Sequence, residues 1–141
     1  MADVLLSVVT LLTNSWNSAN TASRTPVFDE IFDKKRIDLR ANDHILVYEI
    51  SDNEVDNASG GGAKERTVVI ALRIETSLSR AQQALIQTEL KRILRSNEKD
   101  PFSDGVFSIS NIIDDQDASD KFRKIFGRLM KWELKDLDLT F

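Results

Sequence analysis

The sequence contains no cysteine, a single histidine (His44) and only two prolines among its 141 residues. The absence of cysteine excludes disulfide bonds and thiolate-ligated metal sites, and it fits a protein made in a reducing cytoplasm. An excess of basic residues is also missing, because 19 lysines and arginines stand against 23 acidic residues, for a net charge of −4. Sequence-specific nucleic-acid binding usually needs a basic face, so this class of function is not expected.

A long hydrophobic run is missing as well. The apolar stretch VLLSVVTLLT near the N-terminus follows Asp3 instead of a basic segment, and it is too short to span a bilayer. We therefore expect neither a signal peptide nor membrane association. The spacing of its apolar residues predicts an amphipathic helix over residues 3–16. The predicted apolar stripe consists of Val4, Leu5, Val8, Leu11, Leu12 and Trp16.

The length and the hydrophobic content of 41% indicate one domain, residues 1–141. It is arranged around a central strand and helix. Apolar residues alternate over residues 66–76, which predicts a strand. A helix is predicted over residues 79–97, because apolar residues recur there near the helical period and Ser79 with Gln82 has the form of a capping box. The apolar face of the strand consists of Val68, Ile70, Leu72 and Ile74.

Three further strands are predicted at residues 44–51, 106–113 and 128–140, and a short one is considered at 36–39. With the two helices they predict an α+β fold, a small mixed or antiparallel sheet of about four strands on which both helices pack. In the last predicted strand the apolar residues shift from even positions, up to Leu134, to odd positions, from Leu137 on. This shift predicts a bulge or bend near Asp136. The residues predicted to be buried are Leu46, Leu72, Leu85, Leu90, Ile93 and Trp132.

Residues 52–65, DNEVDNASGGGAKE, predict a mobile hairpin loop that contains Gly60, Gly61 and Gly62. A phosphate-binding loop places its glycines between a strand and a helix, whereas a strand follows here, so a nucleotide site is not expected. A long glycine-rich hairpin is either a neutral insertion or an arm that becomes ordered on a partner. Both interpretations remain open at this stage.

No cofactor and no metal ion are predicted. The acidic segment DDQDASD, residues 114–120, is similar in composition to a calcium-binding loop. An EF-hand loop needs glycine at its sixth position and glutamate at its twelfth. Counted from Asp115, these positions hold Asp120 and Phe126, so the spacing fails twice.

Two polar positions have structural interpretations. Asp117 and Ser119 are candidate N-caps of a short helical turn at residues 119–127. His44 begins a predicted strand, and we interpret it as a strand-end residue with its ring half exposed. A catalytic histidine would need a nucleophile and an orienting partner, and the sequence indicates neither.

Three sequence features recur together in one viral protein family. A hairpin strand runs into a helix of the form A-x-x-A-L-I-x-x-E-L-x-x-I-L, here residues 81–94; a short strand, FSISNII, precedes an acidic D-x-S-D element, residues 117–120; and a basic and aromatic segment, KFRKIFGRLMKWEL, becomes the last strand. Over residues 3–134, the chain resembles the tail-terminator (tail-completion) proteins of tailed viruses. The glycine arm and the extension beyond Leu134 have no counterpart in this pattern.

The resemblance implies a structural virion protein without catalysis. It implies a hexameric ring of identical subunits that closes the tail tube and joins it to the neck. The implied partners are other copies of the chain, the tail tube protein and the neck or head–tail connector protein. DNA would pass through the lumen without specific binding, and assembly would take place in the host cytoplasm.

Two alternative classes remain. The first is another head–tail connector, adaptor or tube-capping protein of a virus or injection machine. The second is a small metal-dependent nuclease that uses the carboxylates of the acidic segment. Such nucleases usually combine acidic residues on strands with a lysine, whereas the acidic residues here cluster in one predicted loop.

Charge is distributed unevenly, with net charges of −5 for residues 1–63, +4 for 64–99 and −3 for 100–141. The basic centre is either a solvated helix face or a surface complementary to acidic surfaces of neighbouring subunits. In the second case, basic and apolar side chains form the interface and the glycines order on a partner. The interface candidates are Lys91, Arg92, Arg95, Lys121, Arg123, Arg128, Trp16, Phe28, Leu137, Leu139 and Phe141, with Gly60, Gly61 and Gly62 as the partner-ordered loop.

Overall fold

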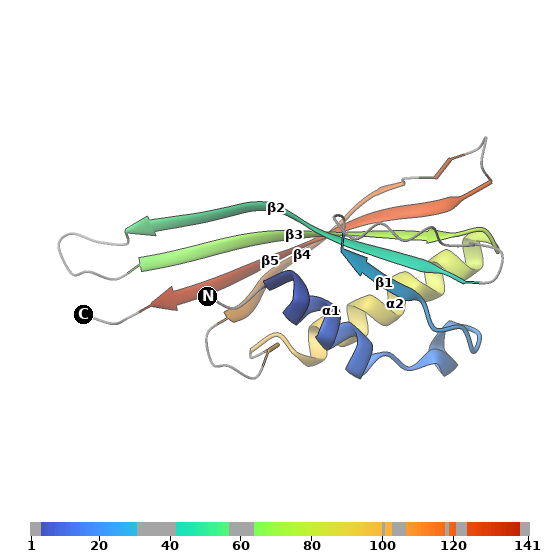
Figure 1. The fold of residues 1–141 in the computed structure, drawn as a ribbon, viewed down its shortest axis with the longest axis horizontal. Coiled ribbons are helices and arrows are strands. Elements are labelled where there is room, and N and C mark those ends of the chain that lie inside the picture. Colours follow the sequence, from blue (N-terminus) through green and yellow to red (C-terminus); the bar gives the residue numbers. More distant parts are fainter. Residues whose placement is uncertain are drawn as a thin grey trace.

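A computed structural model describes residues 4–30, 42–56, 64–99, 101–102, 107–117, 119–120 and 124–138. The fold is α+β, as predicted: a five-stranded mixed sheet with two α-helices packed on the same face (Figure 1). Within these residues, neither helix has the length and apolar character needed to cross a bilayer. The elements in chain order are α1 (Val4–Ser15), the 3-10 helix η1 (Ser18–Thr21), β1 (Val27–Glu30), β2 (His44–Asp56), β3 (Lys64–Thr76), α2 (Arg80–Ser96), β4 (Phe107–Asp117) and β5 (Phe126–Asp138).

The strand order is β1-β2-β3-β5-β4, and β3 lies at the centre of the sheet. β3 pairs antiparallel with both β2 and β5, so the strand predicted at residues 66–76 is the one on which the sheet is built. The additional fifth strand is β1, which pairs parallel with the start of β2 through Val27 and His44. β1 has four residues, too few to show a period-2 pattern in the sequence.

Helix α2 begins where the sequence predicts, but only half of the capping box forms. The Oγ of Ser79 accepts a hydrogen bond from the backbone N–H of Gln82 at 3.0 Å. The Gln82 side chain points elsewhere, and its Nε2 donates to the backbone oxygen of Thr21 and to Oδ2 of Asp43, both at 2.9 Å. Gln82 therefore fixes the start of α2 to the end of η1 and to the residue that precedes β2.

The hydrophobic core lies between the helices and the sheet. Leu72, Leu90, Ile93 and Trp132 are buried as predicted. The prediction for Leu85 is wrong, because 41% of this residue is exposed. Leu85 and Leu90 differ by five positions, about 140° around a helix. The buried position one turn before Leu90 is held by Ile86.

The prediction for Leu46 is also wrong, since it is only partly buried. Ile45 and Val47 point into the helix-covered core and are fully buried. Successive side chains of a strand point to opposite faces. Leu46 therefore lies on the face that the helices leave uncovered.

Bulges occur in the outer strands and not in β5. The β4–β5 register shifts between Ile109 and Asn111, and again between Asp114 and Gln116, whereas the β3–β5 register is continuous. The bulge predicted near Asp136 is therefore wrong. An extra residue in an edge strand disturbs one ladder, whereas in β5 it would disturb two. Because of the first bulge, Ile112 lies opposite Trp132.

The helical turn predicted at residues 119–127 is also wrong. Asp120 and Ile125 form an antiparallel bridge whose two backbone hydrogen bonds are each 2.9 Å long. β5 begins directly afterwards, and Lys124 adopts a left-handed conformation with φ of 54°. The acidic segment is not a separate loop, because β4 continues to Asp117. Among the described residues Asp117 caps no helix, but its side chain accepts a hydrogen bond from the N–H of Ser119 at 3.0 Å and closes a local turn.

Candidate functional site

Strands β2, β3 and β5 extend together beyond both helices and form a three-stranded arm (Figure 1). We define the arm as residues 52–56, 64–67 and 135–138; at its base, the first residues of β4, Phe107 and Ser108, pair with Asp136 and Lys135. In the register, Lys64 lies opposite Asp56 on one side and Asp138 on the other. The arm includes parts of the predicted loop at 52–65, so the outer residues of that segment are paired strand. The loop's central residues, Gly60, Gly61 and Gly62 among them, lie outside the described residues.

The base of the arm is fixed by Arg66. Its Nε and Nη2 donate to Oδ1 and Oδ2 of Asp52 at 2.9 and 2.6 Å. Its guanidinium carbon also lies 5.5 Å from the centroid of the Phe107 ring, and Phe107 makes an edge contact with Phe102. The hydrogen bonds from Arg66 lower the pKa of Asp52 and outweigh its partial burial. The contacts of Arg66 thus link β2, β3 and β4.

The second feature of the candidate site is the outer edge of β2. β1 pairs with β2 only as far as Val47, and within the described part of the chain no strand pairs with β2 beyond it on that side. Ile50 lies at the bulge in β2 and is 47% exposed. The strand contains no basic residue except His44 at its start. Its acidic residues are Glu49, Asp52, Glu54 and Asp56.

The exposed face of α2 is the third feature, and it has the opposite charge. The only acidic residue of this helix, Glu89, is buried. Apart from Arg80 at its first position, the exposed residues of α2 fall within one stripe along the helix. We call this stripe the α2 face: Ala81, Ala84, Leu85, Thr88, Arg92, Arg95 and Ser96. Its first half is small and apolar, and its second half is basic.

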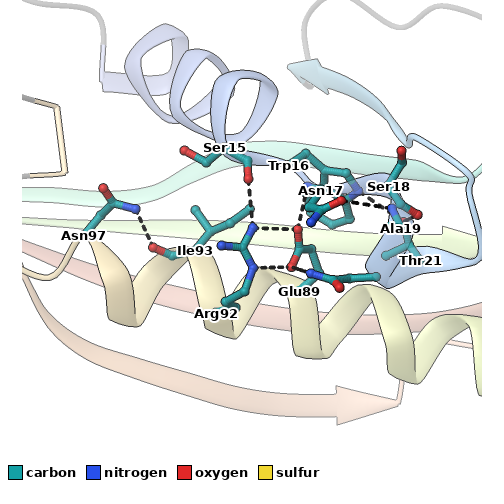
Figure 2. Close-up of polar contacts among 11 residues, drawn as sticks. Ser15, Trp16, Asn17, Ser18, Ala19, Thr21, Glu89, Arg92, Ile93 and Asn97 are labelled. Atoms are coloured by element: carbon teal, nitrogen blue, oxygen red, sulfur yellow. Dashed lines mark hydrogen bonds and ion pairs between the residues drawn. The ribbon is translucent and has the colours of Figure 1, made fainter.

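Arg92 has an intramolecular role as well. Its Nη2 donates to Oε2 of Glu89 and to the backbone oxygen of Ser15, both at 2.8 Å (Figure 2). The carboxylate of Glu89 also accepts from the N–H of Asn17 at 2.7 Å and from Nδ2 of Asn20 at 3.0 Å. These contacts attach the segment after α1 to the middle of α2.

The pKa of Glu89 reflects this surrounding. Burial by itself would raise the pKa of Glu89, but the hydrogen bonds from Arg92, Asn17 and Asn20 together lower it. Sequence reasoning missed this role, because Asn17 and Asn20 lie about seventy residues from Glu89 along the chain.

The remaining predicted interface residues are divided among several places. Arg95 is exposed in the last turn of α2, and Lys91 beside it is partly buried. Arg128 lies near the start of β5 and is also partly buried. Trp16 and Phe28 contact each other edge to face, with ring centroids 5.4 Å apart, and pack against the core.

Leu137 lies in the arm, where the register places it opposite Glu65. The other candidates are outside the described residues: Lys121, Arg123, Leu139 and Phe141.

A buried polar cluster joins the N-terminal part of the chain to the sheet. Asp43 is fully buried and accepts hydrogen bonds from Nη2 of Arg24 at 3.0 Å and Oγ1 of Thr76 at 2.6 Å, besides that from Gln82. The three donors come from three different segments. Arg24 follows η1, Thr76 ends β3 and Gln82 lies in the first turn of α2. We interpret this cluster as structural, because its carboxylate is already satisfied by protein donors.

His44 is more buried than predicted, since only 13% of its side chain is exposed. Its Nε2 lies 3.6 Å from Oδ2 of Asp29, and within the described residues neither buried atom has a hydrogen-bond partner. Desolvation lowers the pKa of His44, while Glu75 and Asp29 oppose this shift. The pair therefore lies at the junction of β1 and β2 without a strong contact.

Two surface hollows accompany these features. One, of about 480 Å³, lies between α1 and the end of α2 and is lined by residues that include Leu6, Leu11 and Phe102. The other, of about 420 Å³, lies beside the β4–β5 connection and is lined by residues that include Arg80 and Asp117. In the described ranges, no three His, Asp or Glu side chains are grouped to hold a metal ion. No protein-family model matches this chain, and no curated protein matches it in sequence.

Proposed function

We propose that this chain is a structural subunit of a virion ring that terminates the tail tube of a tailed virus and joins it to the neck. The observation that carries the proposal is the three-stranded arm. Strands that project beyond their helices bury little surface within their own chain. Such a projection gains stability when another molecule covers it.

The distribution of the features supports a ring in particular. The arm projects at one end of the molecule, whereas α2 begins under the opposite end of the sheet (Figure 1). A contact between two different surfaces of identical subunits is heterologous, and it closes into a ring when the rotation between neighbours permits. The number six follows from the resemblance to tail-terminator proteins.

The remaining parts of the proposal concern the partners. Besides its own copies, the ring contacts the tail tube protein on one side and the neck or head–tail connector protein on the other. DNA passes through the lumen without specific binding. The net charge of −4 suits this passage, because phosphate binding requires clustered lysines and arginines. The role is structural, not catalytic, and assembly takes place in the host cytoplasm.

The arm also supports a second function, that of another connector protein in the particle. A head–tail adaptor or tube-capping protein also requires a subunit that presents two different surfaces. Position in the particle distinguishes these functions, because a terminator lies at the head-proximal end of the tail tube.

Negative-stain electron microscopy of the purified chain, followed by antibody labelling of virions, tests the proposal. We expect rings in the purified protein and labelling at the junction of tail and neck. Labelling elsewhere in the virion favours another connector. A chain that stays monomeric in every preparation and is absent from virions contradicts the proposal.

A truncation tests the part played by the arm. Deleting residues 137–141 removes the end of β5, where Leu137 and Asp138 pair with β3. We expect weaker ring assembly by sedimentation velocity and an unchanged far-UV circular dichroism spectrum. Unfolding of the truncated monomer, or an intact ring, contradicts an interface role for this segment.

A further inference from the structure

We propose that the α2 face of one copy binds the outer edge of β2, residues 48–56, on the next copy. This inference rests on the proposed ring and identifies the two surfaces that meet in it. The occupant of each surface is therefore a second copy of this chain.

The helix side of the contact combines an apolar anchor with free positive charge. Leu85 is exposed near the middle of the α2 face, between Ala81 and Thr88. Arg95 is exposed in the last turn, and among the described residues it has no ion-pair partner. From Ala81 to Ser96 the face is about 22 Å long at 1.5 Å per residue.

The strand side is complementary in each respect. Ile50 is 47% exposed, and Glu49 beside it is exposed as well. The part of β2 without a described neighbour on its outer edge, residues 48–56, is about 30 Å long at 3.3 Å per residue. An apolar residue next to negative charge on one surface thus meets an apolar residue on a helix face whose positive charge begins about 10 Å further along, at Arg92.

The same charges disfavour the symmetrical alternatives. Two α2 faces packed together would bring arginines against arginines, and two β2 edges would bring acidic residues against acidic residues. β4 is also acidic, with Asp114, Asp115 and Asp117, so pairing of β2 with β4 of another copy is disfavoured in the same way. The α2 face carries charge opposite to that of the β2 edge, and a contact between these two different surfaces is heterologous.

Charge reversal provides the test, with sedimentation velocity and negative-stain microscopy of the full chain as readouts. We expect Arg95→Glu and Glu49→Arg each to weaken self-association by about tenfold or more, because each replaces an attraction by a repulsion. The double variant should recover most of the wild-type association. Leu85→Ser and Ile50→Ser should weaken it too, and neither should unfold the chain, because both side chains are exposed.

Matched controls lie just beyond the α2 face. Lys99→Glu and Glu98→Arg make the same charge changes at exposed positions outside it, and both should associate like wild type. Circular dichroism and thermal melting of every variant separate loss of contact from loss of fold.

The outcomes distinguish this inference from the proposed function. Wild-type rings that persist in Arg95→Glu and Glu49→Arg overturn the α2–β2 contact and leave the ring function standing. Single variants that dissociate without recovery in the double variant also overturn the pairing of these two surfaces. A wild-type chain that never associates overturns both.

Discussion

The guanidinium of Arg66 on β3 lies over the ring of Phe107 on β4, 5.5 Å from its centroid, although β5 runs between the two strands. Asp136 on β5 lies opposite both residues in the register. The same guanidinium holds Asp52 on β2 through two hydrogen bonds. One side chain therefore links β2, β3 and β4 across β5 at the point where the arm leaves the body.

The first prediction concerns this bridge. Replacing Arg66 by methionine should raise the pKa of Asp52 toward its ordinary value of 3.8, because the hydrogen bonds from Arg66 are the main cause of the lowered pKa. The loss of stability near pH 7 should stay within about 1 kcal/mol, since the Asp52 side chain is 30% exposed. NMR titration of the carboxyl carbon measures the pKa, and Arg66→Lys is the control. An unchanged pKa in Arg66→Met would show that the ion pair is absent in solution.

The second prediction concerns Glu89. Replacing it by alanine leaves Arg92, Asn20 and the N–H of Asn17 without their acceptor, and should cost about 3 kcal/mol of unfolding free energy. Because the folded-state pKa of Glu89 is lowered, its contribution is present above the ordinary value of 4.5 and is lost as the pH falls through the lowered value. Urea unfolding of Glu89→Ala measures the cost. Thr88→Ala, on the exposed side of the same turn, should change stability by less than about 1 kcal/mol.

The third prediction compares two leucines of α2. Leu90 is fully buried and Leu85 is 41% exposed. Leu90→Ala should therefore cost about 2–5 kcal/mol, and Leu85→Ala less than about 0.5 kcal/mol in the monomer. Chemical denaturation of both variants at a concentration that prevents association measures the difference. Equal losses would contradict the orientation of the helix.

The fourth prediction concerns acid sensitivity at His44. Its pKa is lowered in the folded state, so the unfolded chain takes up the proton first, and stability should fall as the pH drops below 6.5. Glu75 and Asp29 oppose the shift, so the effect should be modest. Thermal melts between pH 7 and 5 should show a smaller decrease for His44→Gln than for wild type. A steeper decrease of the melting temperature in His44→Gln would contradict a lowered pKa for His44 in the folded state.

Much of the fold is predictable from local pattern. The central strand, the start of α2 at Ser79 and the four long strands all follow from periodicity and capping, which depend on neighbouring residues. The face of α2 is less predictable, because Leu85 and Ile86 are adjacent apolar residues and only packing against the sheet selects Ile86. Short β1 depends on its parallel neighbour β2, and no pattern within Val27–Glu30 reveals it.

The candidate site is harder to predict from the sequence, because it too depends on pairing between segments and not on local pattern. Residues 52–56 have the composition of a loop, yet pairing with β3 extends β2 through them. An uncovered strand needs no apolar alternation, so its sequence carries little strand signal. The basic character of α2 follows from its composition, but the partners Asn17 and Asn20 of Glu89 come from the segment after α1 and become visible only in three dimensions.

The strand order has a consequence for the folding pathway. β2–β3 and β4–β5 are each formed from neighbouring strands, whereas β3 and β5 join the two pairs across α2 and β4. Local hairpins close within microseconds, and contacts between distant segments form later because a long loop must first be closed. The union of the two hairpins along β3 and β5 is therefore the expected slow step. Until it occurs, the core around Val68, Ile70 and Trp132 is incomplete, and we expect the newly made chain to be most prone to aggregation at this step.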